Sequence, residues 1–160
     1  MILKIATYPN KILETPCEEV GFPVPDAVRQ LIKNMLETVR DANGIGLAAP
    51  QVNKNLRIIV VNLEYAGIPA FALINPKVAW SSKKTTEMEE GCLSIPGVFG
   101  MVERPEKITF SGQDINGKII TARCGGILSK VVQHEIDHTN GILILEKIKK
   151  YTQGKELLKK

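Results

Sequence analysis

The segment 134–138, with the sequence HEIDH, constrains this chain more than any other feature. The residues before it carry apolar side chains at helical spacing, and two residues four apart on a helix lie on the same face. His134 and His138 can therefore direct two imidazole rings at one metal ion, and Glu135 can reach a water at that ion. The alternative is a buried helix whose histidines hydrogen-bond within the core. Because the chain has only these two histidines and both stand in this segment, a metal site is favoured.

The composition is that of a globular protein with a core of its own. The 160 residues are 44% hydrophobic and 24% charged, which excludes a disordered chain and predicts one domain over residues 1–160. A net charge of +4 is too small to indicate sequence-specific binding of nucleic acid. No apolar run is long enough to span a membrane and no signal peptide is recognisable, so we expect a cytoplasmic location. Three widely spaced cysteines indicate reduced thiols, of which Cys17 and Cys124 are expected in the core.

Two helices are expected, one on each side of a group of strands, which is typical of the α+β class. An amphipathic stripe predicts a helix that begins near Asp26, as its N-cap, and ends at Asn43-Gly44. The second helix follows residues 125–126, carries the HEIDH segment and ends before Gly141.

Four segments between these helices have the pattern of strands: 56–63, 70–78, 108–110 and 118–121. The last two are expected to form a hairpin through residues 114–117, because Asn-Gly is a strong turn signal. The polar stretch 80–86 predicts a hairpin turn or a loop, and the proline-rich segment 1–24 predicts irregular structure. Residues 142–145 are expected to form a short strand or the start of a final helix, and the lysine-rich tail 149–160 a solvated, fraying end.

Residues 44–51, with the sequence GIGLAAPQ, form a small and glycine-rich segment. It is not a phosphate-binding loop, because no Gly-Lys-Ser/Thr follows it. Glycines here permit either a tight turn or the close approach of a ligand to the backbone, and the segment taken alone favours the turn.

A catalytic site of the zinc type has three protein ligands and one open position, so a third ligand is required. The metzincin pattern needs a histidine six residues after His138, where Ile144 stands instead. A downstream glutamate, as in thermolysin-like peptidases, would have to be Glu146, which is too close, or Glu156, which lies in the tail. Cys92 remains, and a thiolate is a good ligand for zinc or ferrous iron.

Three segments, 44–51, 90–96 and 133–138, together resemble the signature stretches of the peptide deformylase family, in the family's order. The N-terminal part is also similar, so the likeness extends over almost the whole chain. The resemblance implies an α+β fold in which antiparallel or mixed β-sheets pack around a central helix that bears the H-E-x-x-H motif. It also implies a metal-dependent hydrolase that removes the N-terminal formyl group, as formate, from N-formylmethionyl nascent polypeptides.

The resemblance also assigns roles to individual residues. The implied set comprises the metal ligands Cys92, His134 and His138, the general base and acid Glu135, the oxyanion donors Gln51 (side chain) and Leu93 (backbone N–H), and the peptide-binding residues Ile45, Gly46 and Gly91. The implied ion is Fe²⁺, and Zn²⁺, Ni²⁺ or Co²⁺ can replace it in a purified sample.

Some positions depart from the family pattern or leave alternatives open. Thr139 stands where many members have leucine, and Phe99 stands where some have an arginine at the pocket edge, which leaves the preference beyond the first substrate residue unassigned. Cys92 could instead be a nucleophile paired with a histidine. Three further charged residues form either a network that orients the ligands or an ordinary surface salt bridge: Glu90, Arg104 and Asp137.

Two other functions stay open, a small metallopeptidase and a non-enzymatic module that stores metal or binds the ribosome. The tail is shorter than the long basic helix by which a bacterial deformylase docks on the ribosome. Its lysines could still contact the ribosome near the exit tunnel: Lys149, Lys150, Lys155, Lys159 and Lys160. The expected partners are therefore N-formylmethionyl nascent peptides and, through these lysines, the ribosome.

Overall fold

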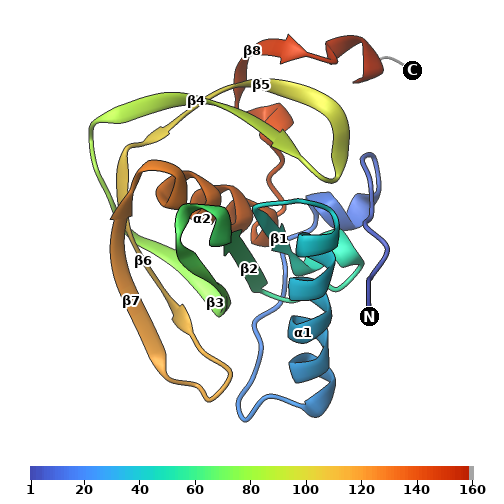
Figure 1. The fold of residues 1–160 in the computed structure, drawn as a ribbon, viewed down its shortest axis with the longest axis vertical. Helices are drawn as coiled ribbons and strands as arrows, with labels where there is room; N and C mark the ends of the chain where they lie inside the picture. Colours follow the sequence, from blue (N-terminus) through green and yellow to red (C-terminus); the bar gives the residue numbers. More distant parts are fainter. Residues whose placement is uncertain (159–160) are drawn as a thin grey trace.

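The computed structural model describes residues 1–158 and contains two α-helices and two antiparallel β-sheets (Figure 1). The helices and strands in chain order are α1 (Asp26–Asp41), β1 (Gly46–Ala48), β2 (Ile58–Leu63), β3 (Ile68–Ser81), β4 (Thr85–Cys92), β5 (Ile95–Pro105), β6 (Lys107–Gln113), β7 (Ile119–Gly125), α2 (Gly126–Thr139) and β8 (Ile148–Gln153). One sheet has the strand order β1-β2-β3-β6-β7, and the other has the order β4-β5-β8. The expected α+β class is confirmed.

Helix α2 lies between the two sheets, as Figure 1 shows. Its apolar residues Val131, Val132 and Ile136 are buried in one cluster with side chains of the five-stranded sheet. Its polar residues meet the three-stranded sheet, where Asp137 pairs with Arg104 of β5. The helix therefore presents its apolar side to one sheet and its functional side chains to the other. The central placement expected of the H-E-x-x-H helix is confirmed.

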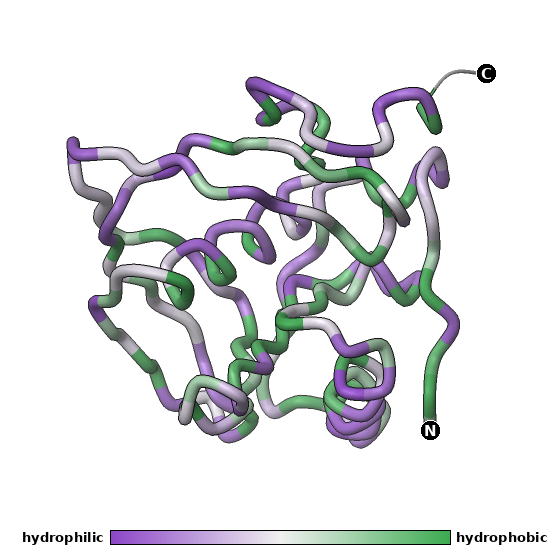
Figure 2. Tube along the Cα trace, turned by 45° about the horizontal axis from the view of Figure 1, so that its top comes forward, coloured by the Kyte–Doolittle hydropathy of each residue, from purple (hydrophilic) through white to green (hydrophobic). Residues whose placement is uncertain are grey.

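Helix α1 packs against β2 through its apolar stripe, which includes Leu31, Met35 and Val39. Polar and apolar stretches alternate along this helix, as the hydropathy colours of Figure 2 show. Asp26 is the first residue of the helix rather than its cap, because Pro25 occupies the N-cap position with extended backbone angles. Asn43 then adopts a φ of 54°, the left-handed conformation that closes helices. Neither helix in the described part of the chain has the length and apolarity that crossing a lipid bilayer requires.

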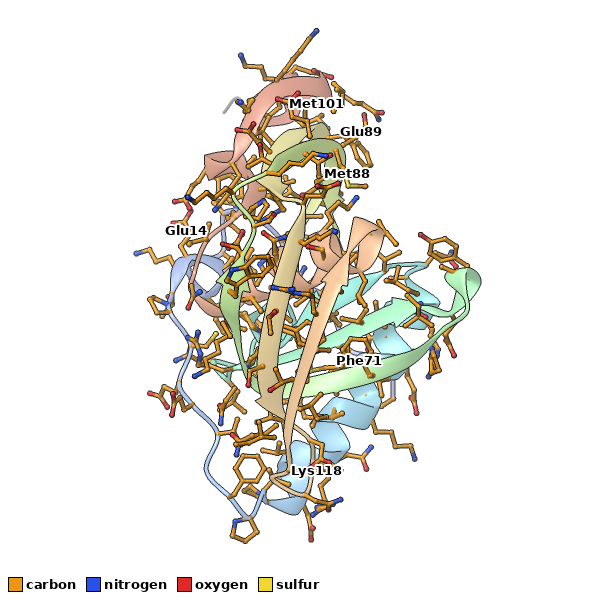
Figure 3. All side chains as sticks on the ribbon, turned by 90° about the vertical axis from the view of Figure 1, so that its left-hand side faces the viewer. Glu14, Phe71, Met88, Glu89, Met101 and Lys118 are labelled. Atoms are coloured by element: carbon orange, nitrogen blue, oxygen red, sulfur yellow. The ribbon has the colours of Figure 1, made fainter. Side chains whose placement is uncertain are left out.

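The strand expectations are confirmed, and the structure extends them. Strand β3 contains Asn75 with a φ of 53° and shifts its register against β6 between Ile74 and Lys77, so one long strand contains a bulge at this point. Strands β6 and β7 form the expected hairpin, whose turn includes Gly117 with a φ of 84°. Figure 3 shows Lys118 of this hairpin at one end of the molecule and Glu89 near the other. Of the polar stretch 80–86, residues 80–81 belong to β3 and residues 85–86 to β4. Only residues 82–84 form a loop, and because it connects the two sheets, the interpretation as a hairpin turn is wrong.

The C-terminal part differs from expectation. Residues 142–145 form neither a strand nor the start of a final α-helix, because the only element between α2 and β8 is a 3₁₀ turn at Ile144–Glu146. The tail is not a fraying end as far as residue 158, since β8 pairs with β5 and Ile148 packs beside Gly100. Lys159 and Lys160 lie outside the described residues.

Candidate metal centre

Three potential metal ligands from distant parts of the chain converge between α2 and β4. Their ligand atoms all lie within 4.8 Å of one another, and the residues are Cys92, His134 and His138. Cys92 is the last residue of β4, and its Sγ lies 3.4 Å from Nε2 of His138. The two histidines are one helical turn apart on α2, as their sequence spacing requires. The sequence-based prediction that these side chains come together is therefore met by the geometry.

The buried carboxylate of Glu90 fixes the orientation of His134, and buried Arg104 holds that carboxylate in place. Its Nδ1 lies 2.9 Å from Oε1 of Glu90, which leaves Nε2 directed toward the other two ligands. Arg104 donates two hydrogen bonds to the same carboxylate, at 2.6 and 2.9 Å, and a third at 2.8 Å to Asp137. Arg104 is 5% exposed and Glu90 is 3% exposed, so this is an internal network rather than a surface salt bridge.

The charges around the centre favour a cation. Burial lowers the pKa of His138 to well below its usual value, so that its ring is neutral and can coordinate a metal. Burial also acts to lower the pKa of His134, but the nearby Glu135, Cys92 and Glu90 outweigh it and raise that pKa well above the usual value. The same anionic surroundings that hold a proton on His134 would attract a metal cation in its place.

Two buried polar atoms of this centre have no hydrogen-bond partner among the described residues, namely Oε1 of Glu135 and Nδ1 of His138. Buried polar atoms without a partner are uncommon in proteins, because each costs free energy. A thiolate with two imidazoles is also a donor set typical of zinc or ferrous iron. The residues therefore fit a metal ion.

The glycine-rich segment 44–51 lies directly against Glu135. A Cβ atom on Gly46 would stand 2.5 Å from Oε2 of Glu135, and one on Gly44 would stand 2.8 Å from the Leu93 side chain. Gly46 begins the extended strand β1, so the tight turn that the segment alone favours is not formed at this glycine, and its lack of a side chain leaves room for Glu135. Burial raises the pKa of Glu135 to about 7, a value suited to a group that exchanges protons near neutral pH.

The side chain of Gln51 is fixed at both ends. Its Oε1 accepts a hydrogen bond from the backbone N–H of Ala48 at 2.9 Å. Its Nε2 lies 3.1 Å from Oγ of Ser94 and 3.5 Å from Sγ of Cys92. Gln51 is thereby directed at the metal centre, and Ser94 is a contributor that sequence reasoning did not identify. The one feature of the sequence that could have indicated Ser94 is a hydroxyl side chain two residues after Cys92.

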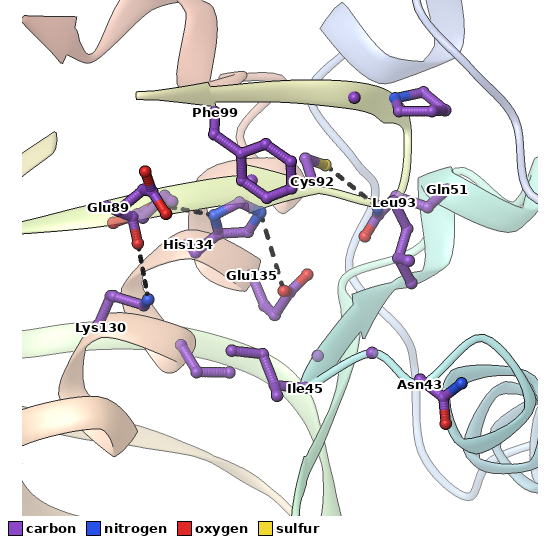
Figure 4. A pocket seen from close by; sticks show the side chains of 17 residues that line it. Asn43, Ile45, Gln51, Glu89, Cys92, Leu93, Phe99, Lys130, His134 and Glu135 are labelled. Carbon is purple, nitrogen blue, oxygen red and sulfur yellow. Dashed lines mark hydrogen bonds and ion pairs between the residues drawn. The ribbon is translucent and has the colours of Figure 1, made fainter. Parts of the chain in front are cut away.

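A cavity of about 640 Å³ opens onto this centre (Figure 4). Eight of the nine residues predicted from the sequence line it, all except His138: Ile45, Gly46, Gln51, Gly91, Cys92, Leu93, His134 and Glu135. Figure 4 shows Lys130 and Glu89 at one end of the cavity, Asn43 at the other, and His134 and Glu135 between them. Phe99, which the resemblance places at the pocket edge, also lines the cavity, and so does Lys130, which sequence reasoning did not identify.

Comparison with known proteins points to the same family that the three sequence segments resemble. Residues 2–154 match the model of the family described as polypeptide deformylase. A peptide deformylase of Dictyoglomus thermophilum is 44% identical over 147 residues, which are 92% of this chain and 93% of the relative. Peptide deformylase 1 of Bacillus cereus is 40% identical over 98% of both chains.

Solved structures agree with the sequence comparison. A class I type b peptide deformylase from Acinetobacter baumannii superposes with a TM-score of 0.89 at 34% identity and covers 92% of this chain and 99% of its own. A peptide deformylase from Synechococcus elongatus, solved in complex with actinonin, has a TM-score of 0.86 at 41% identity and covers 92% of this chain and 79% of its own. The family match over residues 2–154 includes the segments that form the candidate metal centre.

Proposed function

The chain belongs to the peptide deformylase family, metal-dependent hydrolases that remove the formyl group from N-formylmethionyl nascent polypeptides, and we propose that Cys92, His134 and His138 hold its metal. The observation that carries this assignment is the convergence of one sulfur and two imidazole nitrogens within 4.8 Å. The neutral state of His138 and the hydrogen bond between Glu90 and His134 support it further. We also assign residues 1–160 to a single catalytic domain.

The substrate binds as an extended strand between Ile45-Gly46 on one side and Gly91 on the other. Glycine is needed on both sides, because a Cβ on Gly46 would meet Glu135 and a Cβ on Gly91 would meet the ring of Phe99. Strands β1 and β4 each stand at the edge of a sheet and pair with another strand on one side only, so the backbone groups on their other side can pair with a peptide regardless of its sequence. Such binding suits a substrate whose common feature is its formylated end.

When bound, the ion acts as a Lewis acid and lowers the pKa of a coordinated water. Glu135 accepts the proton of the water that attacks the formyl carbon, and then delivers it to the departing amine. Its pKa near 7 in the buried site makes both transfers accessible at neutral pH. The Gln51 side-chain amide and the Leu93 backbone N–H donate hydrogen bonds to the formyl oxygen as negative charge develops on it.

We propose Fe²⁺ as the native ion. The donor set suits both Fe²⁺ and Zn²⁺, and Ni²⁺ or Co²⁺ can also occupy it in a purified sample. Purification without oxygen, followed by elemental analysis, tests the proposal. One equivalent of iron per chain with full activity supports it, whereas an active protein that contains zinc alone contradicts it.

The metallopeptidase alternative is tested with formyl-Met-Ala-Ser. Formate release with the peptide bonds intact supports deformylation, and cleavage of a peptide bond without formate release would support a peptidase.

We further propose that the protein works in the cytoplasm, where its nascent substrates are made, and that it reaches the ribosome near the exit tunnel through its C-terminal lysines. Lys150 and Lys155 are exposed on the described part of the tail, whereas Lys149 pairs with Glu87 and Glu103. Cosedimentation with ribosomes at low and high salt tests this contact, because an electrostatic contact weakens as salt rises. Equal recovery of a K150Q/K155Q variant would contradict it.

A further inference from the structure

Lys130 stands on the same face of α2 as His134, one helical turn before it. Four residues of helix correspond to about 6 Å along the helix axis. Lys130 lines the same cavity as the metal centre, and Figure 4 shows it at the end of that cavity beside Glu89. An unbranched side chain on the first substrate residue can reach this end when the formyl group lies at the metal centre.

The ammonium group of Lys130 is only partly satisfied. Within residues 1–158 it makes one hydrogen bond, to the backbone oxygen of Glu89 at 3.1 Å, and no ion pair. The carboxylate of Glu89 instead accepts a hydrogen bond from Thr152, and that of Glu90 is engaged by Arg104 and His134. An ammonium has three N–H donors, so two remain for another acceptor.

Partial burial of this charge has a cost that a suitable ligand would offset. Burial lowers the pKa of Lys130, which shows that the protein interior disfavours its charged form. Lys130 is also the only lysine or arginine among the described residues that line the cavity. The cavity therefore ends in a hydrogen-bond donor that attracts an acceptor on the substrate.

Methionine and its oxidation product differ at the atom concerned. The thioether sulfur of methionine is a weak acceptor, whereas oxidation converts it to a sulfoxide with a polar oxygen. In a wholly apolar pocket that oxygen would lose its hydrogen bonds to water without replacement.

We propose that Lys130 is a specificity-determining residue whose ammonium donates a hydrogen bond to the sulfoxide oxygen of an oxidised first residue, so that the enzyme also deformylates chains that begin with N-formylmethionine sulfoxide. The inference rests on the proposed function and extends its substrate class to oxidised N-termini.

The test compares three substrates that differ only in the first side chain: formyl-Met-Ala-Ser, the corresponding sulfoxide, and the corresponding norleucine peptide, which has no heteroatom. The values of kcat/KM are measured by formate release for the metal-loaded wild type and for K130M, K130R and K118M. Methionine retains most of the lysine stem but has no donor, and arginine retains donors. Lys118 is exposed at the far end of the molecule (Figure 3), so K118M is a matched control for loss of a positive charge.

The expected result is that K130M lowers kcat/KM for the sulfoxide peptide at least tenfold more than for the methionine and norleucine peptides. K130R should keep the ratio of sulfoxide to methionine activity within threefold of wild type, and K118M should not change it. A K130M variant that changes all three substrates by the same factor would overturn the role of Lys130 while leaving deformylation intact. If the wild type released no formate from formyl-Met-Ala-Ser, the proposed function would fail, and the inference with it.

Discussion

Glu90 accepts a hydrogen bond from Nδ1 of His134 at 2.9 Å while its own carboxylate is held by Arg104. An acid on β4 thereby fixes the tautomer and the orientation of a proposed metal ligand on α2. The side chains of Glu90, Arg104 and His134 are all buried. Removal of the Glu90 carboxylate would therefore leave the charge of Arg104 buried and without its main partner.

The first prediction is that Glu90→Gln weakens metal binding about 10- to 100-fold and destabilises the protein by about 3–5 kcal/mol. Metal affinity is measured by competition with a chelator, and stability by urea unfolding of the metal-free protein. Glu103→Gln is a matched control, because Glu103 pairs with Lys149 on the exposed side of β5. Equal effects of the two substitutions would show that Glu90 has no special part in the site.

The second prediction concerns acid stability. Burial acts to raise the pKa of Glu90, but hydrogen bonds from His134 and Arg104 outweigh it and lower that pKa to about 2, from an ordinary value of 4.5. A carboxyl group with a lowered pKa stabilises the fold above its unfolded-state pKa, and this stabilisation is lost as the pH falls toward the folded-state value. The melting temperature of the metal-free protein should therefore fall between about pH 5 and pH 2. Glu90→Gln should flatten this dependence, and an unchanged slope would count against it.

The third prediction is that Cys92→Ser lowers metal affinity sharply, whereas Cys124→Ser does not. All three cysteines are free thiols, and burial raises the pKa of Cys124, which packs against the core cluster around α2. A partly buried thiol with a raised pKa is a poor ligand, because a metal binds the thiolate. Metal content after dialysis distinguishes the variants, and a Cys92→Ser protein that retains its full metal content would contradict the ligand assignment.

The fourth prediction is that Glu135→Gln keeps its metal but loses activity by about 10²–10⁴-fold. The amide has nearly the same shape as the carboxylate, but it cannot accept the proton of the attacking water. Glu146→Gln serves as the control, because Glu146 is exposed and is the downstream glutamate that a thermolysin-like site would require. Loss of metal from Glu146→Gln, or residual activity near wild type in Glu135→Gln, would argue for a different site.

The sequence predicted the features that depend on local pattern or on a motif. Helix α1 follows from an apolar stripe, the β6–β7 hairpin from Asn116-Gly117, and the position of both histidines in the candidate metal centre from their helical spacing. The ordered tail could not be predicted, because β8 has few apolar residues and depends on backbone pairing with β5 and on contact between Ile148 and Gly100.

Ser94 and Lys130 were missed for a related reason. Their partners, Gln51 and the backbone of Glu89, lie 43 and 41 residues away in the chain. No local pattern specifies a hydrogen bond between segments so far apart, because the folded backbone alone brings them together. Sequence reasoning therefore identified the residues that carry a motif, whereas the structure added Ser94, which contacts Gln51, and Lys130, which lines the cavity.

The last prediction follows from Ser94, which is fully buried and accepts a hydrogen bond from Nε2 of Gln51 at 3.1 Å. With its Oε1 bonded to Ala48, the Gln51 amide has one orientation, in which its other N–H faces the metal centre. Ser94→Ala removes one acceptor worth about 1 kcal/mol, so kcat should fall roughly five- to tenfold while KM and metal content stay the same.

A double-mutant cycle separates positioning of Gln51 from a general structural effect. If Ser94 acts only through Gln51, the double variant Gln51→Ala/Ser94→Ala should have the same kcat as Gln51→Ala alone. Independent, multiplicative losses would mean that Ser94 contributes in another way. A rise in KM with kcat unchanged would instead show that Ser94 affects peptide binding. An interaction lowers kcat when it is lost only if it strengthens in the transition state, as the formyl oxygen gains charge.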